Sequence, residues 1–340
     1  MSQVSVKVRK KIIVQSLFDK PKKETKGNFK FIDLFAGIGG IRIGFENAGG
    51  DCVFTSEWDE PAKKTYQANF GELPHGDITK IKPSEIPKFN VLLAGFPCQP
   101  FSQAGLKKGF NDTRGTLFFD IARIVEYHKP EVVFLENVRN FATHDKGNTF
   151  RVVKKTLEGL GYTVYSKILN AKNFGVPQNR ARIYIVAFKF NIPFEFPKEL
   201  NTPTRLGNIL EKRVDKKYTI SDRLWAGHQR RKREHREKGN GFGYSLFNSS
   251  SVYTSTISAR YYKDGSEILI EQKGKNPRKL TPREAARLQG YSDSFIIPVS
   301  DNQAYKQFGN SVAVPVIKSL AKKIIKTIKR ENIKFKQYEN

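Results

Sequence analysis

Short apolar segments alternate with segments of helical periodicity through most of the first half of the chain. The apolar segments predict strands at residues 31–35, 52–55, 91–94, 132–135, 164–169 and 183–188. The periodic segments predict helices at residues 41–48, 61–70, 117–127 and 150–160. This alternation is typical of βαβ units, so we expect an α/β fold built on a mainly parallel sheet.

The alternation stops near Phe194, and the composition changes there. The following hundred or so residues are rich in Gly, Ser and Arg, contain only short β-like pieces, and predict a smaller, mostly β domain. A last helix is predicted at residues 312–329, and we expect it to pack back on the first domain. The predicted organisation is a basic arm (1–28), a large α/β domain (29–204), the smaller domain (205–300) and a hinge with the returning helix (301–340).

The chain carries a large excess of positive charge. Its 60 Lys and Arg residues against 33 Asp and Glu residues give a net charge of +27. So large an excess indicates a polyanionic partner, nucleic acid first, and the alternative is a generally basic surface without a partner. No apolar run approaches the ~18 residues of a membrane span, so no membrane association is expected.

The two cysteines, Cys52 and Cys98, are too few for a disulfide scaffold or a cysteine-based metal site. They favour a reducing, cytoplasmic location. The histidines show no metal-ligand spacing, and we therefore predict no metal site.

A glycine turn after the first predicted strand indicates a cradle for a nucleotide-like ligand. Gly37 and Gly39 would let the backbone approach a ligand closely, and the helix that follows would present its positive end. The dinucleotide fingerprint fails because Arg42 stands where its third glycine belongs. The alternative is a tight strand–helix junction that binds no ligand.

Polar and aromatic residues at the expected distances complete this cradle. Glu57 lies about 20 residues after the glycine turn, where an acid can accept both hydroxyls of a ribose. Trp58 offers a ring face for adenine, and Asp77 could accept the adenine amino group. A cofactor with adenosine but no pyrophosphate fits this set, and S-adenosylmethionine is the leading candidate.

Cys98 lies between Pro97 and Pro100, directly after the strand predicted at residues 91–94. Both prolines restrict the backbone to a stiff, non-helical turn. Because ligands of open α/β sheets bind at the carboxyl ends of strands, a thiol held there suits a nucleophile. The alternative is a packed cysteine in an ordinary loop.

A series of sequence blocks resembles, in order, the motifs of the DNA (cytosine-5)-methyltransferases. The blocks lie at residues 33–40, 57–58, 76–78, 95–102, 114–118, 136–138, 178–182, 280–284 and 307–312. Within the family, the chain is similar to bacterial restriction–modification enzymes that read CCGG or CCWGG. The resemblance implies a Rossmann-like, S-adenosylmethionine-dependent catalytic domain at 29–204 and a target-recognition domain at 205–300.

The resemblance also assigns catalytic roles to four residues. The Cys98 thiolate would add to C6 of cytosine, and Glu136 would protonate or hydrogen-bond N3. Arg182 would contact O2 of the base, and Arg180 would lie in the same shell or contact phosphate. The residues predicted to bind the cofactor are Phe35, Gly37, Ile38, Gly39, Glu57, Trp58, Asp77, Ile78, Leu117, Asn310 and Ser311.

A cytosine inside a duplex presents neither C6 nor its ring face, so the enzyme must flip the base out. Ser102, on the long loop after Cys98, could enter the vacated space. Basic residues of the run at 229–238 would meet phosphates, and polar residues on glycine-rich loops could reach base edges. The predicted DNA-binding residues are Ser102, Arg230, Arg231, Arg233, Asn240, Thr256, Arg260 and Tyr262.

Three other functions compete with that of a DNA methyltransferase: an RNA methyltransferase, an inactive member that only binds DNA, and a thiol hydrolase with His128 or His144 as its base. The long basic segment disfavours the first, and the intact catalytic set disfavours the second. We expect a monomer that methylates the inner cytosine of a short palindrome beginning CC, with CCGG favoured. Such methylation would protect DNA from a cognate restriction endonuclease, which would be the functional partner.

Overall fold

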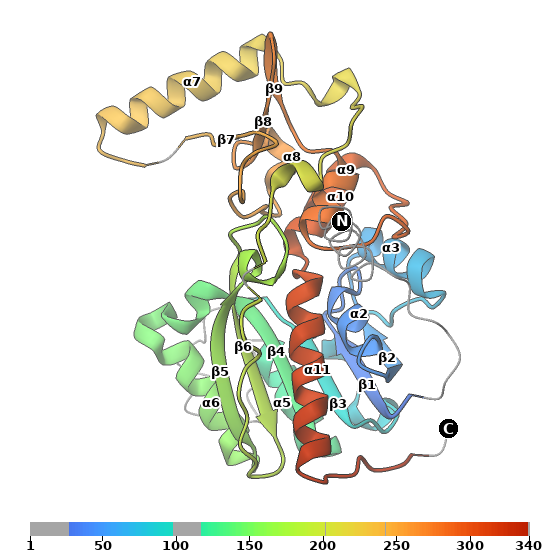
Figure 1. The fold of residues 1–340 in the computed structure, drawn as a ribbon. Helices are drawn as coiled ribbons and strands as arrows, with labels where there is room; N and C mark the ends of the chain where they lie inside the picture. Colours follow the sequence, from blue (N-terminus) through green and yellow to red (C-terminus); the bar gives the residue numbers. More distant parts are fainter. Residues whose placement is uncertain (1–26, 98–116, 201, 242, 339–340) are drawn as a thin grey trace, which may run out of the picture. The chain divides into compact units, whose positions relative to one another are not determined.

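The computed structural model describes residues 27–97, 117–200, 202–241 and 243–338 (Figure 1). The expected arm at 1–28, except its last two residues, and the loop with Cys98 and Ser102 lie outside these ranges. The chain divides into two compact units. The large unit contains Lys23–Asn170, Ala181–Lys198 and Val316–Asn340, and the small unit contains Ala171–Arg180 and Glu199–Pro315.

The large unit is built on a six-stranded sheet of order β2-β1-β3-β4-β6-β5. Its strands are β1 (Phe29–Leu34), β2 (Gly50–Ser56), β3 (Val91–Gly95), β4 (Val132–Val138), β5 (Thr163–Asn170) and β6 (Ala181–Phe188). β1 pairs in parallel with β2 and β3, and β3 pairs in parallel with β4. Only β6 runs against its neighbours β4 and β5. The expected α/β fold with a mainly parallel sheet is confirmed.

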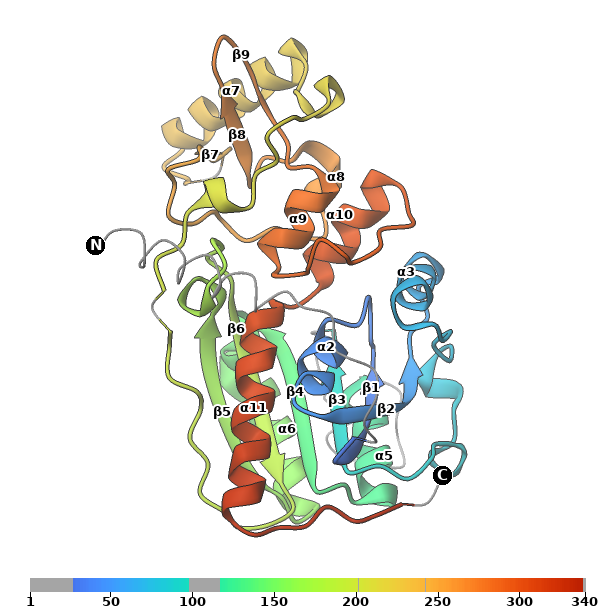
Figure 2. The same ribbon diagram turned by 45° about the vertical axis from the view of Figure 1, so that its right-hand side comes forward.

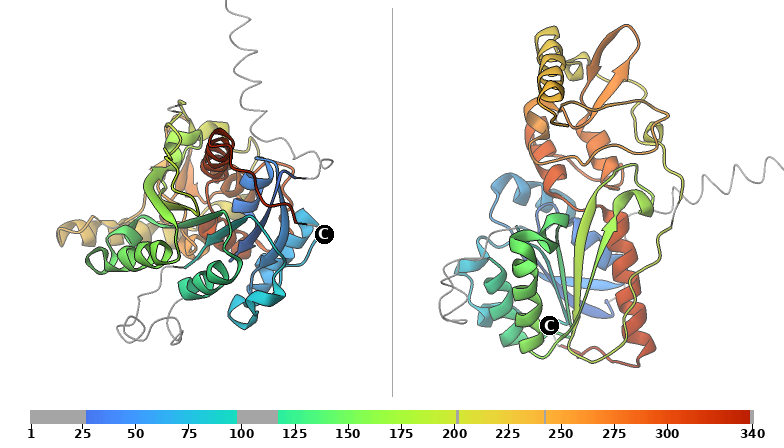
Figure 3. Two further views of the ribbon diagram at one scale, coloured as in Figure 1. Left: turned by 90° about the horizontal axis from the view of Figure 1, so that it is seen from below. Right: turned by 90° about the vertical axis from the view of Figure 1, so that its left-hand side faces the viewer.

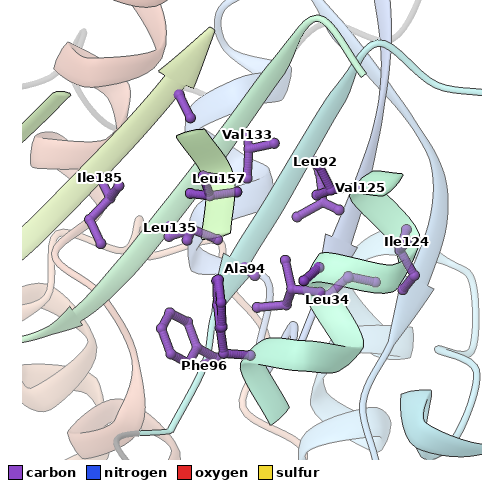
Figure 4. Packing of buried hydrophobic residues seen from close by; sticks show 14 of the residues in the cluster. Leu34, Leu92, Ala94, Phe96, Ile124, Val125, Val133, Leu135, Leu157 and Ile185 are labelled. Carbon is purple, nitrogen blue, oxygen red and sulfur yellow. The ribbon is translucent and has the colours of Figure 1, made fainter. Parts of the chain in front are cut away.

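Helices cover both faces of this sheet (Figures 1 and 3). They are α2 (Gly40–Glu46), α5 (Leu117–His128), α6 (Asn148–Gly159) and α11 (Val314–Arg330), whereas α3 (Glu60–Phe70) lies beyond the end of β2. On one face, the apolar sides of α5 and α6 pack on Leu92, Val133 and Ile185 (Figure 4). On the other, α11 packs against α2 so closely that a Cβ at Gly44 would lie 2.4 Å from Ile317. Each such buried side chain contributes about 1.5–3 kcal/mol, which fixes both helix layers.

Among the residues that the structure describes, the small unit has a three-stranded sheet of order β7-β8-β9 and four α-helices (Figure 2). The strands are β7 (Leu246–Phe247), β8 (Leu269–Gln272) and β9 (Lys275–Arg278). The helices are α7 (Asp222–Glu237), α8 (Tyr261–Asp264), α9 (Pro282–Leu288) and α10 (Asp301–Asn310). The short β-like pieces were expected, whereas the longest element, α7, was not predicted.

Short 3₁₀ turns connect these elements. They lie at Ile78–Lys80, Pro83–Glu85, Arg139–Ala142, His144–Gly147, Ala171–Phe174, Leu206–Asn208 and Lys216–Tyr218. Within the ranges that the structure describes, none of the helices has both the length and the apolar character needed to cross a membrane.

Candidate active site

The glycine turn between β1 and α2 is left-handed at several positions. Phe35 has φ 55°, Gly37 has φ 55° and Gly39 has φ 80°. A Cβ at Gly39 would lie 2.2 Å from the ring of Phe70, so Gly39 allows α3 to pack on the turn. A Cβ at Gly37 would meet no atom of the described residues within 4 Å. The turn therefore has open space beside Gly37, whereas the ring of Phe70 fills the space beside Gly39.

The carboxylate of Glu57 joins the end of β2 to this turn. Its Oε2 accepts a hydrogen bond of 2.8 Å from the N–H of Gly37. Its Oε1 accepts bonds of 2.8 Å from the N–H groups of Trp58 and Asp59. A carboxylate has about four lone-pair positions, and three are already used. If Glu57 is to accept hydrogen bonds from both hydroxyls of a ribose, as expected, one of these three N–H groups must give up its bond or share its lone pair with a hydroxyl.

The predicted adenine-binding residues lie beside Glu57. Trp58 is 75% exposed, which is unusual for so large an aromatic side chain. The N–H of Glu57 donates to the carbonyl of His75, which holds the segment before Asp77 along the end of β2. Asp77 Oδ1 accepts bonds from the N–H and hydroxyl of Thr79, and so caps the turn at Ile78–Lys80.

A buried polar cluster, which the sequence analysis did not predict, supports the glycine turn. Asp33 on β1 is fully buried, and burial raises the pKa of its carboxyl group well above the usual range. Arg42 on α2 bonds to Glu46 at 2.6 Å, to the hydroxyl of Tyr66 at 2.9 Å and to Glu72. Arg42, which replaces the third glycine of the dinucleotide fingerprint, thus ties α2 to α3. Asp33 could have been identified from the sequence, because it is a charged residue within an apolar strand.

The carboxyl end of β3 leads towards the predicted nucleophile. β3 ends at Gly95, where an added Cβ would lie 3.7 Å from Glu136 Oε2 on the paired strand β4. The Nδ2 of Asn137 donates a buried bond of 2.9 Å to the carbonyl of Phe96. These contacts fix the start of the segment that carries Cys98, whose own position lies outside the described residues.

Glu136 and Arg182 are brought together by the direction of β6. Because β6 is antiparallel to β4, its first residues lie at the carboxyl edge of β4, and Arg182 pairs in register with Val138. Arg182 Nε lies 3.3 Å from Glu136 Oε1, and Glu136 is only 8% exposed. A largely buried carboxyl group and a guanidinium therefore face each other at the edge where β1, β2 and β3 also end.

The other cysteine of the chain, Cys52, lies on β2. Burial raises the pKa of Cys52 to about 12, and its Sγ donates to the carbonyl of Phe54. At neutral pH this side chain stays a thiol, which is a poor nucleophile. Of the two cysteines in the sequence, this leaves Cys98 as the candidate.

Arg180, Asn310 and Ser311 belong to the small unit. Arg180 is 3% exposed, and its guanidinium donates to the carbonyls of Ile257, Gly309 and Ser311. Asn310 is exposed at the end of α10. The structure thus brings Arg180 to the predicted cofactor motif at 310–311 and Arg182 to Glu136.

The predicted DNA-binding residues of the small unit lie in several environments. Arg230, Arg231 and Arg233 are on α7, and Arg231 forms an ion pair of 3.2 Å with Asp264. The other members are Asn240 after α7, Thr256, and Arg260 and Tyr262 around α8. The Thr256 hydroxyl donates to the carbonyl of Asn179 at 2.6 Å, whereas the side chains of Asn240, Arg260 and Tyr262 are exposed.

Comparison with known proteins places these features in a family. Residues 29–326 match the family model of the C-5 cytosine-specific DNA methylases. Type II methyltransferase M.SsoII of Shigella sonnei is 65% identical over 308 residues, which are 89% of this chain and 81% of that protein. Type II methyltransferase M.HpaII of Haemophilus parainfluenzae is 48% identical over 322 residues, 88% of this chain and 90% of that protein. The solved structure of S. pombe Dnmt2 methyltransferase has a TM-score of 0.72 at 22% identity and covers 89% of this chain and 99% of its own, a similarity of fold.

Proposed function

Because the chain belongs to the C-5 cytosine-specific DNA methylases, we propose that it transfers a methyl group from S-adenosylmethionine to C5 of a cytosine flipped out of double-stranded DNA. The observation that carries the proposal is the buried pair of Glu136 and Arg182 at the carboxyl edge of β4, beside the end of β3. This pair can hold one cytosine by N3 and O2 while the segment after β3 presents a thiol.

The chemistry requires C5 of cytosine to become nucleophilic. Addition of the Cys98 thiolate to C6 pushes electrons towards N3, and C5 becomes an enamine carbon that can take a methyl group from a sulfonium. Glu136 stabilises the charge at N3 by protonating or hydrogen-bonding it. Arg182 orients Glu136 and contacts O2. Transfer of the C5 proton to solvent, elimination of the Cys98 thiolate and return of the N3 proton to Glu136 then release 5-methylcytosine.

The cofactor residues of the large unit fit an adenosine without pyrophosphate. S-adenosylmethionine supplies the methyl sulfonium when it is bound. The open space at Gly37 accommodates a close approach to the backbone, and the exposed ring of Trp58 can stack on adenine. Glu57 would accept the ribose and Asp77 the adenine amino group. Phe35, Ile38, Gly39, Ile78 and Leu117 complete the proposed site of the large unit, and Asn310 and Ser311 are the proposed cofactor-binding residues of the small unit.

The outer face of α7 is the proposed phosphate-binding surface. Arg223, Arg230 and Arg233 are all exposed and follow one another at i, i+7 and i+10, which places them on one side of the helix. Arg231 faces the other way, towards Asp264, and Lys232 lies 4.3 Å from the ring centroid of Tyr244. We therefore propose phosphate contacts for Arg223, Arg230 and Arg233 and a packing role for Arg231.

The proposal includes the DNA sequence that is methylated and the biological role of that methylation. The exposed side chains of Asn240, Arg260 and Tyr262 are the candidates for base contacts, and the target is a short palindrome beginning CC, with CCGG favoured. Relatives named Type II methyltransferases support a role in protecting DNA from a restriction endonuclease. The enzyme would act as a monomer on duplex DNA in the cytoplasm.

Bisulfite sequencing of DNA from cells that express the protein tests this function. We expect methylated cytosines at one short site, and none with Cys98→Ser. In vitro, the wild type with S-adenosylmethionine should form a covalent complex with duplex DNA containing 5-fluorocytosine at that site. Methylation of RNA alone, or full activity of Cys98→Ser, would overturn the proposal.

A further inference from the structure

Three buried side chains form a hydrogen-bonded junction inside the small unit. Gln178 and Gln289 are 0% exposed, and Arg180 is 3% exposed. Their partners are almost all main-chain atoms, and apart from the carbonyl of Leu288 these atoms belong to two segments with different proposed roles. One is the proposed recognition segment at 256–260, and the other is the cofactor motif at 307–312.

Gln178 binds one segment directly and reaches the other through Gln289. Its Oε1 accepts a bond of 3.1 Å from the N–H of Ile257. Its Nε2 donates to Gln289 Oε1 and to the carbonyl of Leu288, each at 3.1 Å. Gln289 Nε2 then donates to the carbonyl of Phe308 at 2.6 Å.

Arg180 spans the same two segments with a single guanidinium. Its Nη1 donates to the carbonyl of Ile257 at 3.1 Å. Its Nη2 donates to the carbonyls of Gly309 at 3.1 Å and Ser311 at 2.5 Å. The two segments also touch, because a Cβ at Gly309 would lie 2.3 Å from the backbone carbonyl of Ser258.

From this geometry we propose that Arg180 and Gln178 are positioning residues that couple the choice of DNA site to cofactor binding. The inference rests on the proposed function. The N–H and the carbonyl of Ile257 both form hydrogen bonds with side chains of the junction. DNA that moves Ile257 must therefore also move Gly309 and Ser311, or leave buried polar groups without hydrogen-bond partners, which costs free energy. Because such coupling acts equally in both directions, cofactor bound at Asn310 and Ser311 stabilises one position of the recognition segment at 256–260.

The coupling is measured as a ratio of dissociation constants. The probe is duplex DNA with the site found by bisulfite sequencing, bound with and without S-adenosylhomocysteine, and a duplex with one base changed serves for discrimination. For the wild type we expect S-adenosylhomocysteine to tighten binding to the correct site by about 5–150-fold, the usual range of such coupling. The changed duplex should show a smaller effect.

Variants of the junction should reduce this ratio. Arg180→Met and Gln178→Glu are expected to bring it close to 1 and to weaken S-adenosylhomocysteine binding at least tenfold, with on the order of 10-fold less discrimination between the duplexes. Arg180→Lys keeps the charge and should restore part of the ratio. Arg205→Met, at an exposed arginine of the same unit, is the matched control and should behave like wild type. All measurements are made well below each variant's melting temperature. If Arg180→Met does not fold, Gln178→Glu and Arg180→Lys still test the coupling.

Four results would overturn the coupling. An Arg180→Met enzyme that transfers methyl slowly but keeps both dissociation constants and the ratio would make Arg180 a catalytic residue. A lower melting temperature with an unchanged ratio would make the junction only structural. A wild-type ratio of 1 in an enzyme that still methylates its site would end the coupling and leave the proposed function standing, whereas absence of any methylation would remove both.

Discussion

At the scale of single residues, Glu136 carries the proposed activation of the base. Its carboxyl group lies 3.3 Å from the Arg182 guanidinium and is largely buried, so it is held in place before substrate arrives. Glu136→Gln keeps the shape but cannot supply a proton to N3. We expect methyl transfer to fall by about 10²–10⁴-fold in single-turnover assays, with DNA and cofactor binding retained. Glu158→Gln, exposed on α6, is the control, and equal loss in both variants would contradict the role.

Replacement by alanine is expected to reduce mainly cofactor binding at Gly37 and mainly stability at Gly39. Both are left-handed, so each substitution costs about 1–2 kcal/mol of backbone strain. At Gly39 the new methyl group also meets Phe70, which adds about 1–3 kcal/mol of overpacking. At Gly37 it enters the space proposed for cofactor. Urea unfolding should show the larger loss for Gly39→Ala, and titration with S-adenosylmethionine the larger loss for Gly37→Ala. The reverse order would place the cofactor elsewhere.

Asp33 predicts a pH dependence of stability. Burial raises the pKa of its carboxyl group in the folded state, so the folded protein holds this proton more tightly than the unfolded chain does. The associated stability is fully present below pH ~3.9, the usual pKa of an aspartate, and is lost as the pH rises towards the folded-state pKa. Asp33→Asn does not ionise, so its free energy of unfolding relative to wild type should increase between pH 4 and pH 8. A constant difference in urea unfolding across this range would refute the shift.

At the scale of elements, α7 is predicted to set the salt dependence of DNA binding. Each phosphate contact contributes about −0.9 to the slope of log K against log salt concentration. Replacing Arg223, Arg230 and Arg233 by glutamine should therefore make the slope less negative by up to about 3, and it should weaken binding to all sequences alike. Fluorescence anisotropy at several salt concentrations measures this slope.

The control removes the same charge from another helix. Arg151, Lys154 and Lys155 are exposed on α6, and their replacement by glutamine should leave the slope nearly unchanged. If both triple variants change the slope equally, binding responds to net charge rather than to α7. Arg231→Gln breaks the ion pair with Asp264 and should act mainly on stability.

The same elements show how far the sequence could predict this structure. Most strands of the large unit are short, nearly continuous apolar runs, and its helices carry apolar residues at a period of 3.6, so their positions were predictable within a few residues. α7 was missed because its buried residue is His228 and its remaining positions are mostly charged, which leaves no apolar stripe. The contacts of Arg180 with Ile257 and Ser311 join residues 77 and 131 positions apart, and local patterns carry no information about such pairs.

At the scale of the whole molecule, the junction connects to the proposed recognition domain through main-chain atoms. Gln178 and Arg180 contact the N–H and carbonyl of Ile257 rather than its side chain. Every amino acid except proline presents these two groups, so the recognition sequence can change without loss of the junction. Target choice should therefore be separable from chemistry in this chain.

A chimera tests this separation. Residues 205–300 are replaced by the corresponding segment of a relative whose methylation pattern differs from that of the wild type, while Gln178, Arg180, Gln289 and Gly309 are kept. We expect a folded enzyme that still forms the covalent 5-fluorocytosine complex, because Cys98, Glu136 and Arg182 are unchanged. Its bisulfite pattern should follow the donor of the segment. A chimera that methylates the original site would place recognition outside residues 205–300, and one that binds cofactor but traps no DNA would show that the junction needs its own recognition segment.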